Sequence, residues 1–356
     1  MLIKTEYILK RDHLKTPYSK NKVINFITET FRIFIISLFF VTIFSIFFPL
    51  KAAEDFDSWL ISYKKHAESK GISKETINIA FQNVKFLDQV IKYDRKQPEF
   101  YEDTITYVSK RSNQSRINKA KKLLKKHIDL FNEIENKFSV EKEILLSLWG
   151  IETNFGKHVG KMDIISCLAT LSFDKRRRDF FSSQLLILLK LIDQKLIEPD
   201  TLYGSWAGAF GNFQFMPSTI KNYAIDYDGN NKIELKNSLL DSVASAANYI
   251  NRIGWKKDEP CFYRVKLNKK INRKYINTSA RNIKHRFKVN KWKKKGLSNL
   301  DGSAINLNLK AALILPDGKE NSPSYLVFQN YEKILKWNRS LRFAISVCTL
   351  ANKIKT

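Results

Sequence analysis

The stretch "LLSLWGIETNFGKHVG", Leu145–Gly160, decides how this sequence is interpreted. If the stretch is helical, Leu145, Leu148, Trp149 and Glu152 share one face, because they are spaced i, i+3, i+4 and i+7. A helix normally buries such an apolar face against its neighbours. The pattern therefore predicts a helix that carries a single carboxylate on its buried side.

Glu152 has no lysine or arginine near it in the sequence before Lys157. Burial favours the protonated form of a carboxyl group. A protonated glutamate can give its proton to a leaving group, which makes Glu152 a candidate general acid. The alternative interpretation is a structural glutamate that pairs with a buried arginine or with a backbone N–H.

A second stretch, "GSWAGAFGNFQFMPSTIKNYAID", holds three glycines and two alanines in its first eight residues, from Gly204 to Gly211. Small residues let another chain approach the backbone closely. Ser205 and Gln214 add hydrogen-bonding groups, and the apolar residues that follow Gln214 add a wall. This composition predicts the floor of a groove that binds a polymer. Pro217 fits the first turn of a helix over 218–225.

Composition and charge narrow the compartment and the partners. The 356 residues include 62 Lys+Arg and 35 Asp+Glu, a formal charge of +27, which predicts an anionic partner such as nucleic acid, a membrane surface or an anionic polymer. The uncharged run 33–48 follows a basic segment, so residues 1–53 are either a cleaved export signal or a retained inner-membrane anchor over 33–50. An exported chain rarely meets nucleic acid. We therefore expect a periplasmic protein, with no nucleic acid among its partners.

The three cysteines, Cys167, Cys261 and Cys348, are far apart in the sequence and none lies in a CxxC motif. They predict neither a zinc site nor a disulfide framework. Cys167 lies in the apolar segment "IISCLATLSF" and is expected to be a small buried side chain. A single disulfide, either Cys167–Cys261 or Cys261–Cys348, remains possible.

The periodicity predicts a mainly α (α+β) fold. Helical patterns cover 55–71, 116–138 and 339–355, whereas "CFYRVKL" and "AALILP" alternate as strands do. We expect a helical domain over 54–138 that is joined by the C-terminal helix of 320–356, a helical core over 139–258, and a small basic β domain over 259–319. Residues 262–300 hold 14 Lys/Arg and no Asp or Glu; a solvated face is the simplest explanation.

Four motifs in this order, "GIETNFG", "LATLSFDKRRRDFF", "GSWAGAFGNFQFMPS" and "ANYI", resemble the lytic murein transglycosylase B family, the membrane-bound type. The resemblance runs from about Tyr107 to the end, and more loosely from Asp55. It implies a lysozyme-like helical core, flanked by a helical domain and a small β domain. It also implies a monomeric enzyme that cleaves the MurNAc–GlcNAc bond of peptidoglycan glycan strands without water and leaves 1,6-anhydro-MurNAc ends.

The resemblance also assigns roles. Glu152 is implied as the single acid and then base, in place of the usual two carboxylates. Arg177 and Arg178 would meet a peptide or muramyl carboxylate. The implied glycan-contacting positions are Tyr107, Ser205, Gln214, Tyr249 and Asn338. Two alternatives from the sequence stay open: a muramidase that uses water, and a non-catalytic murein-binding scaffold.

Three aromatic residues depart from the family pattern. Trp337 and Phe343 stand where tyrosines are expected, which predicts the loss of two hydroxyl hydrogen bonds. Phe213 replaces a small or polar residue and is expected to narrow one subsite.

The segment that begins "DYDGNNKIELKN" resembles the opening of an EF-hand loop. Asp226, Asp228 and Asn230 occupy positions 1, 3 and 5, and the Lys232 carbonyl is available at 7. Position 12 is not the usual glutamate, and the family closes a modified loop with a later aspartate, here Asp241. The pattern predicts a structural Ca²⁺, with no cofactor required for the chemistry. A solvated polar turn is the alternative.

Overall fold

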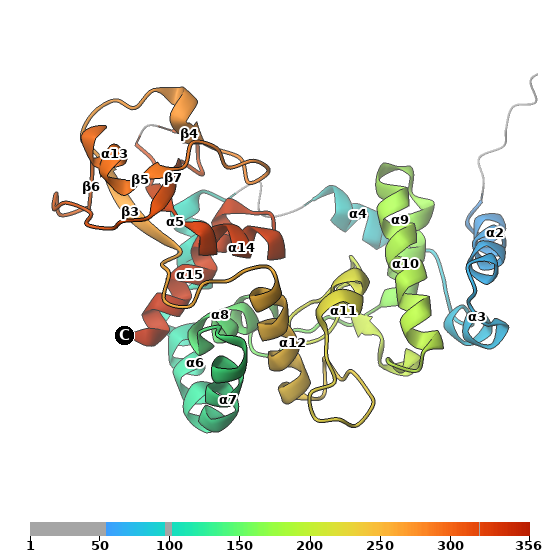
Figure 1. Ribbon diagram of the computed structural model, residues 1–356. Helices are drawn as coiled ribbons and strands as arrows, with labels where there is room; N and C mark the ends of the chain where they lie inside the picture. Colours follow the sequence, from blue (N-terminus) through green and yellow to red (C-terminus); the bar gives the residue numbers. More distant parts are fainter. Residues whose placement is uncertain (1–54, 97–101, 320) are drawn as a thin grey trace, which may run out of the picture. The chain divides into compact units, whose positions relative to one another are not determined.

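The computed structural model describes residues 55–96, 102–319 and 321–356 (Figure 1). The predicted signal or anchor over 33–50 lies outside these residues. Within the described ranges, none of the helices has the length and apolar character needed to cross a membrane. From Phe56 onward the chain is mainly helical with a small mixed sheet, so the predicted fold class is confirmed.

The first helices form because apolar residues recur at helical spacing between clear caps. Helix α2 buries Trp59 and Tyr63 and is followed by Gly71, whose φ of +85° suits glycine. Ser73 caps α3 by accepting a hydrogen bond from the Thr76 backbone N–H. The bounds are α2 Phe56–Ser69, α3 Lys74–Ala80 and α4 Asp88–Arg95.

Four helices follow, of which the last carries Glu152. The predicted helical region 116–138 is divided at His127, which ends one helix and precedes the next. The bounds are α5 Thr104–Arg111, α6 Gln114–Lys126, α7 Ile128–Phe138 and α8 Lys142–Thr153. The C-terminal helix α15, Leu341–Lys355, packs on α5, α6 and α8 although it is far from them in sequence.

The middle of the chain places short loops between packed helices. Helix α10 packs on α9, α11 and α3, and α12 packs on α7 and α11. Pro217 begins α11, as predicted from its fixed φ. The bounds are α9 Ile164–Phe173, α10 Arg178–Asp193, α11 Pro217–Tyr223 and α12 Leu239–Arg252, with the two-residue strands β1 Met162–Asp163 and β2 Tyr203–Gly204 paired antiparallel.

The small sheet has the strand order β4-β7-β8-β3-β6, with β5 paired to β7. Both segments predicted as strands are confirmed, in β3 and β7. The sheet has its own apolar cluster, which includes Trp292, Leu313 and Leu326. The bounds are β3 Phe262–Leu267, β4 Ile276–Asn277, β5 Phe287–Lys288, α13 Val289–Lys294, β6 Leu297–Ser298, β7 Lys310–Ile314, β8 Ser324–Val327 and α14 Gln329–Trp337.

A disulfide fixes β3 to the C-terminal helix. It joins Cys261 to Cys348, and Cys167 is a free, buried cysteine. Of the two bridges that the sequence left open, the structure therefore contains the second. The expectation that Cys167 is a small buried side chain is confirmed.

Candidate active site

Glu152 lies in the last turn of α8. Leu145 and Leu148 on the same face are fully buried, whereas Glu152 is only half-buried. The helix stops here because Asn154, Phe155 and Gly156 all have positive φ. The carboxylate is therefore held in the last turn of a packed helix, where it is partly exposed to solvent.

The indole of Trp337 donates a hydrogen bond to this carboxylate. The distance from Trp337 Nε1 to Glu152 Oε1 is 2.8 Å. Trp337 is the last residue of α14, so the bond joins two elements separated by 185 residues. The Trp337 indole N–H is thus a donor at a position where a tyrosine hydroxyl was expected; the predicted loss of two hydroxyl hydrogen bonds stays a prediction.

A stack of aromatic rings fixes the orientation of Trp337. Its ring lies 5.0 Å from that of Tyr249 at an interplanar angle of 21°, and Tyr249 in turn stacks on Tyr223 at 4.3 Å. Phe213 and Phe215 pack against the indole at 6.2 and 5.3 Å with steep angles. Such pairs add stability beyond their buried area. The indole N–H is therefore presented in one defined direction.

Tyr249 takes part in this stack through both its ring and its hydroxyl. The hydroxyl donates to the Lys336 carbonyl at 3.1 Å, and burial raises the pKa of Tyr249 to about 12. The phenol is therefore protonated at neutral pH and binds the end of α14. Its predicted contact with glycan stays a prediction.

The glycine-rich loop packs closely against the segment after α8. A Cβ on Gly160 would lie 2.0 Å from the Gly204 carbonyl oxygen, so the backbones can approach this closely only with glycine. Ser205 Oγ accepts from the Ala209 N–H at 3.0 Å. Gln214 donates from Nε2 to the Val159 carbonyl at 3.0 Å. Both predicted groove residues thus shape the loop.

Asn212 is a residue that the sequence interpretation missed. It is 6% exposed, and its Oδ1 accepts from Trp149 Nε1 at 3.1 Å. Its Nδ2 donates to Ser242 Oγ at 3.1 Å, and its backbone carbonyl accepts from Thr153 Oγ1 at 2.8 Å. One side chain thus joins α8, the glycine-rich loop and α12. Its position directly after Gly211 in the glycine-rich loop gave no local signal of these contacts.

The arginines of the "KRRR" motif surround a buried aspartate. Asp94 is 2% exposed and accepts hydrogen bonds from Arg95, Arg176 and Arg177. Arg178 donates to the Phe173 carbonyl at 2.8 Å. Arg95 also donates to Asp174 Oδ1 at 2.9 Å, so the three arginines share two carboxylates. The predicted role of Arg177 and Arg178 in binding a carboxylate stays a prediction.

The two remaining predicted groove residues lie on different elements. Tyr107, in α5, is 1% exposed, and the guanidinium of Arg111 lies over its ring at 3.3 Å. Asn338 follows Trp337 directly and is half-buried. Asn338 is therefore placed beside the Glu152 partner by the chain itself. The roles of both residues stay predictions.

The aspartates of the EF-hand-like segment converge. Ligand oxygens of Asp226, Asp228 and Asp241 all lie within 4.8 Å of one another. Asp241 is fully buried and accepts from the backbone N–H groups of Tyr227 and Glu234. Three carboxylates held this close repel one another unless a cation neutralises them. Oxygen-only donors suit Ca²⁺, so these residues fit that ion.

Similarity to known proteins extends over most of the chain. The model of the family described as Transglycosylase SLT domain matches residues 55–352. The chain belongs to the Transglycosylase SLT domain family. The chain is 30% identical over 233 residues to membrane-bound lytic murein transglycosylase B of Escherichia coli K12. That match covers 64% of this chain and about 60% of the relative.

Solved structures of Transglycosylase SLT domain relatives share the fold. SltB3 from Pseudomonas aeruginosa, in complex with NAG-NAM-pentapeptide, has a TM-score of 0.79 and 31% identity, over 85% of this chain and 80% of that chain. Slt35 of Escherichia coli, in complex with calcium, has a TM-score of 0.70 and 25% identity, over 83% of this chain and 92% of that chain.

Proposed function

We propose that this protein is a peptidoglycan lytic transglycosylase that cleaves the MurNAc–GlcNAc β-1,4 bond and forms 1,6-anhydro-MurNAc ends. The observation that carries the proposal is the half-buried carboxyl of Glu152 in the last turn of α8, which accepts a hydrogen bond from Trp337. Membership of the family and the likeness to a relative solved with NAG-NAM-pentapeptide support the substrate class.

Glu152 acts in two steps in this proposal. It first protonates the glycosidic oxygen, while the N-acetyl group of the substrate stabilises the cationic sugar. The ionised carboxylate then takes the proton from the C6 hydroxyl, whose oxygen closes the anhydro ring. One carboxyl group serves both steps, so the second carboxylate of ordinary glycosidases is not needed.

Trp337 suits this sequence of steps because its indole N–H is a donor only. While Oε1 accepts this bond, the proton to be transferred is directed to Oε2. After the transfer, the same N–H stabilises the carboxylate charge. The indole cannot remove the proton that Glu152 has to move.

The proposal extends to the surroundings of the enzyme. Peptidoglycan glycan strands are the partner, the protein acts as a monomer in the periplasm, and Ca²⁺ held by Asp226, Asp228 and Asp241 supports folding rather than chemistry. The carbonyl of Lys232 and the side chain of Asn230 complete the proposed ligand set. Asn230 Oδ1 accepts from the Lys232 N–H at 2.9 Å, which closes the turn around the aspartates.

The test is Glu152→Gln, with Glu143→Gln on the same helix as the matched control. The first variant should lose activity on sacculi by on the order of a hundred- to ten-thousand-fold, the contribution of a positioned acid, and should still bind them. The control should retain activity. Mass spectrometry of wild-type digests should show anhydro-muropeptides. Reducing ends would indicate a muramidase, and the absence of cleavage a binding protein.

A further inference from the structure

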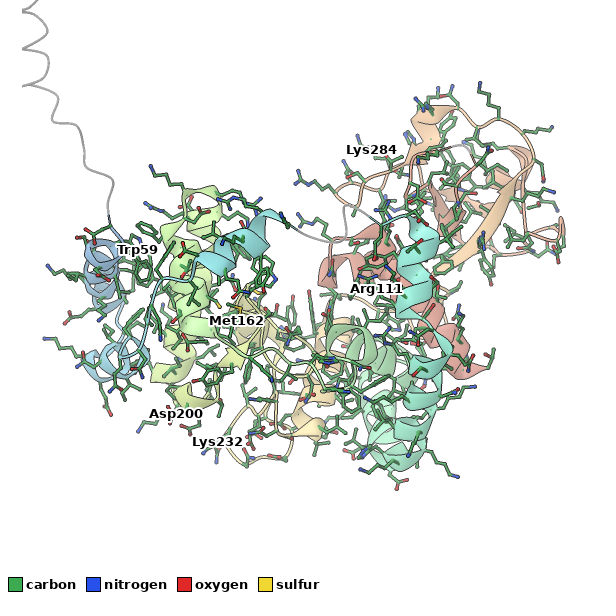
Figure 2. All side chains as sticks on the ribbon, turned by 180° about the vertical axis from the view of Figure 1, so that it is seen from behind. Trp59, Arg111, Met162, Asp200, Lys232 and Lys284 are labelled. Atoms are coloured by element: carbon green, nitrogen blue, oxygen red, sulfur yellow. A yellow bond between two sulfur atoms is a disulfide. The ribbon has the colours of Figure 1, made fainter. Side chains whose placement is uncertain are left out.

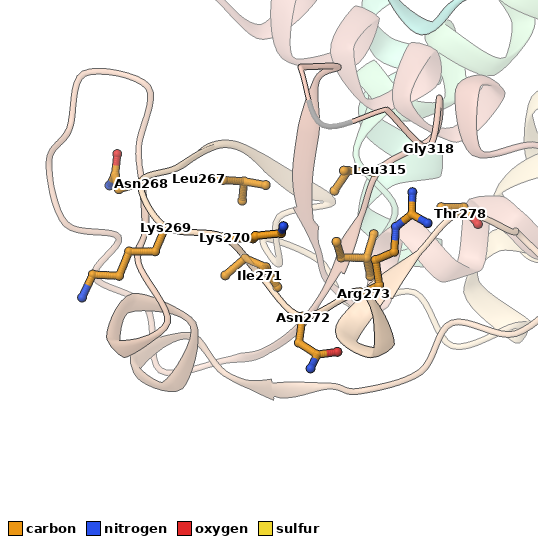
Figure 3. Close-up of a pocket in the computed structure, with 11 residues that line it drawn as sticks. Leu267, Asn268, Lys269, Lys270, Ile271, Asn272, Arg273, Thr278, Leu315 and Gly318 are labelled. Atoms are coloured by element: carbon orange, nitrogen blue, oxygen red, sulfur yellow. The ribbon is translucent and has the colours of Figure 1, made fainter.

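The small β domain contains a large hollow remote in sequence from Glu152. Its volume is about 1270 Å³ (Figure 3). The lining includes Leu267, Asn272, Arg273, Thr278 and Leu315. Apolar side chains thus alternate around it with amides, a hydroxyl and cations. The lining of the hollow is therefore neither purely apolar nor purely charged.

The cations at this hollow are Lys269, Lys270 and Arg273, and all three side chains are exposed. Figure 3 shows Arg273 pointing toward Leu315 and Thr278, whereas Lys269 points away from them. Among the residues that the structure describes, the ion pairs of the segment 262–300 involve only Arg286, with Glu332. The charges at the hollow therefore have no carboxylate partner within the described chain.

Further lysines and arginines of the segment 262–300 lie on the same domain as the hollow. Figure 2 shows nitrogen-tipped side chains projecting around the sheet near Lys284. Such a domain attracts anions over a distance of about a Debye length, roughly 8–10 Å in physiological salt. The shape of the hollow then restricts which anionic partner can bind. A flat lipid surface would meet the domain as a whole, whereas a hollow with amides and apolar walls fits a discrete chain.

We infer that this hollow binds an acidic peptide segment. Lys270 and Arg273 would pair with its carboxylates, Asn272 and Thr278 would bond its backbone amides, and the half-buried Leu267 would contact an apolar side chain. This inference rests on the proposed function in one respect, because it takes the peptide to be a stem peptide of peptidoglycan. The site is separate from the arginines at the start of α10, of which Arg177 bonds to Asp94 and Arg178 to the Phe173 carbonyl.

The experiment compares two double variants with equal loss of charge, both in the Glu152→Gln background so that the polymer is not digested. Lys270→Ala with Arg273→Ala removes the cations of the hollow. Lys293→Ala with Lys294→Ala removes two exposed lysines of α13. Binding is measured to intact sacculi, to sacculi stripped of peptides by an amidase, and to vesicles of an anionic phospholipid. The melting temperature of each variant checks its fold.

The hollow variant should bind intact sacculi about tenfold more weakly, since each exposed ion pair is worth up to about fivefold. Its binding to peptide-free glycan should not change, and the α13 variant should differ from the parent by less than threefold on every surface. An equal loss of sacculus binding in both variants would overturn the inference, because general charge would then explain the binding. A loss of binding confined to vesicles would instead indicate a membrane surface as the partner. Unchanged binding by the hollow variant would exclude the hollow as a binding site. Product analysis of the wild type tests the proposed function separately.

Discussion

Trp337→Phe should impair the proposed chemistry more than it impairs folding. The substitution keeps an aromatic ring between Tyr249 and Phe215 but removes the N–H that lies 2.8 Å from Glu152 Oε1. The stacking that orders α14 is therefore largely retained. The substitution removes the hydrogen bond from the Trp337 indole N–H to Glu152, so the experiment tests that single interaction.

The magnitude follows from the kind of bond. A hydrogen bond to a charged group contributes about 1.5–3 kcal/mol. Glu152 is only half-buried, and solvent screening places the expected loss at the lower end of that range. Since about 1.4 kcal/mol is a factor of ten, kcat/KM should fall by about ten- to thirtyfold. The lost donor also disfavours the ionised carboxylate, so the alkaline limb of the pH profile should move to higher pH.

Trp255→Phe is the matched control. Trp255 Nε1 also donates to a glutamate, Glu141 Oε2 at 2.6 Å, at the start of the same helix α8. This control should lower the melting temperature without moving the pH profile. Initial rates of anhydro-muropeptide release, measured from pH 4 to 9, supply both readouts. If Trp337→Phe stays within twofold of the wild type, or if both variants move the profile equally, Trp337 does not position Glu152.

Three further measurements test the surroundings of the site. Ca²⁺ at a hundred times its Kd should stabilise the fold by about 2.7 kcal/mol and raise the melting temperature by a few degrees, and Asp226→Ala should erase this shift; equal shifts in both proteins would leave only a polar turn. Cys261→Ser should destabilise by up to about 4 kcal/mol, because the Cys261–Cys348 bridge spans 87 residues, and a reductant that leaves the wild-type melting temperature unchanged would contradict this. Sacculus binding should weaken as salt rises, because the basic surface is exposed to solvent; constant binding would exclude electrostatics.

Local periodicity predicted the elements that depend on local physics. The apolar face of 145–152, the Pro217 start and the strand at 262–267 all follow from residue spacing or from fixed backbone preferences. The division between α6 and α7 at His127 could not be predicted from residue spacing, because the apolar pattern continues through His127 into α7. A short break in a continuous pattern depends on how the two helices pack, and packing is not visible in the pattern.

The contacts between residues of the candidate site could be found only from the folded structure. Glu152 was expected to be buried, yet it is half-buried because α8 ends at Thr153, one residue after it. Asn212 and Trp337 reach α8 from 59 to 185 residues away. No periodic pattern encodes a pairing over such a separation. The choice between the two cysteine bridges had the same cause, since only the packing of α15 brings Cys348 to Cys261.

The two departures from tyrosine have different physical consequences. Phe343 is 3% exposed within α15, where a hydroxyl would need a buried partner, so phenylalanine avoids an unsatisfied polar group. Trp337 faces a carboxylate and keeps a donor, but changes its nature. A phenol hydroxyl can accept a hydrogen bond as well as donate one, whereas an indole N–H can only donate. In the proposed mechanism, in which one carboxyl acts first as acid and then as base, position 337 supplies Glu152 with a donor that takes no part in proton transfer.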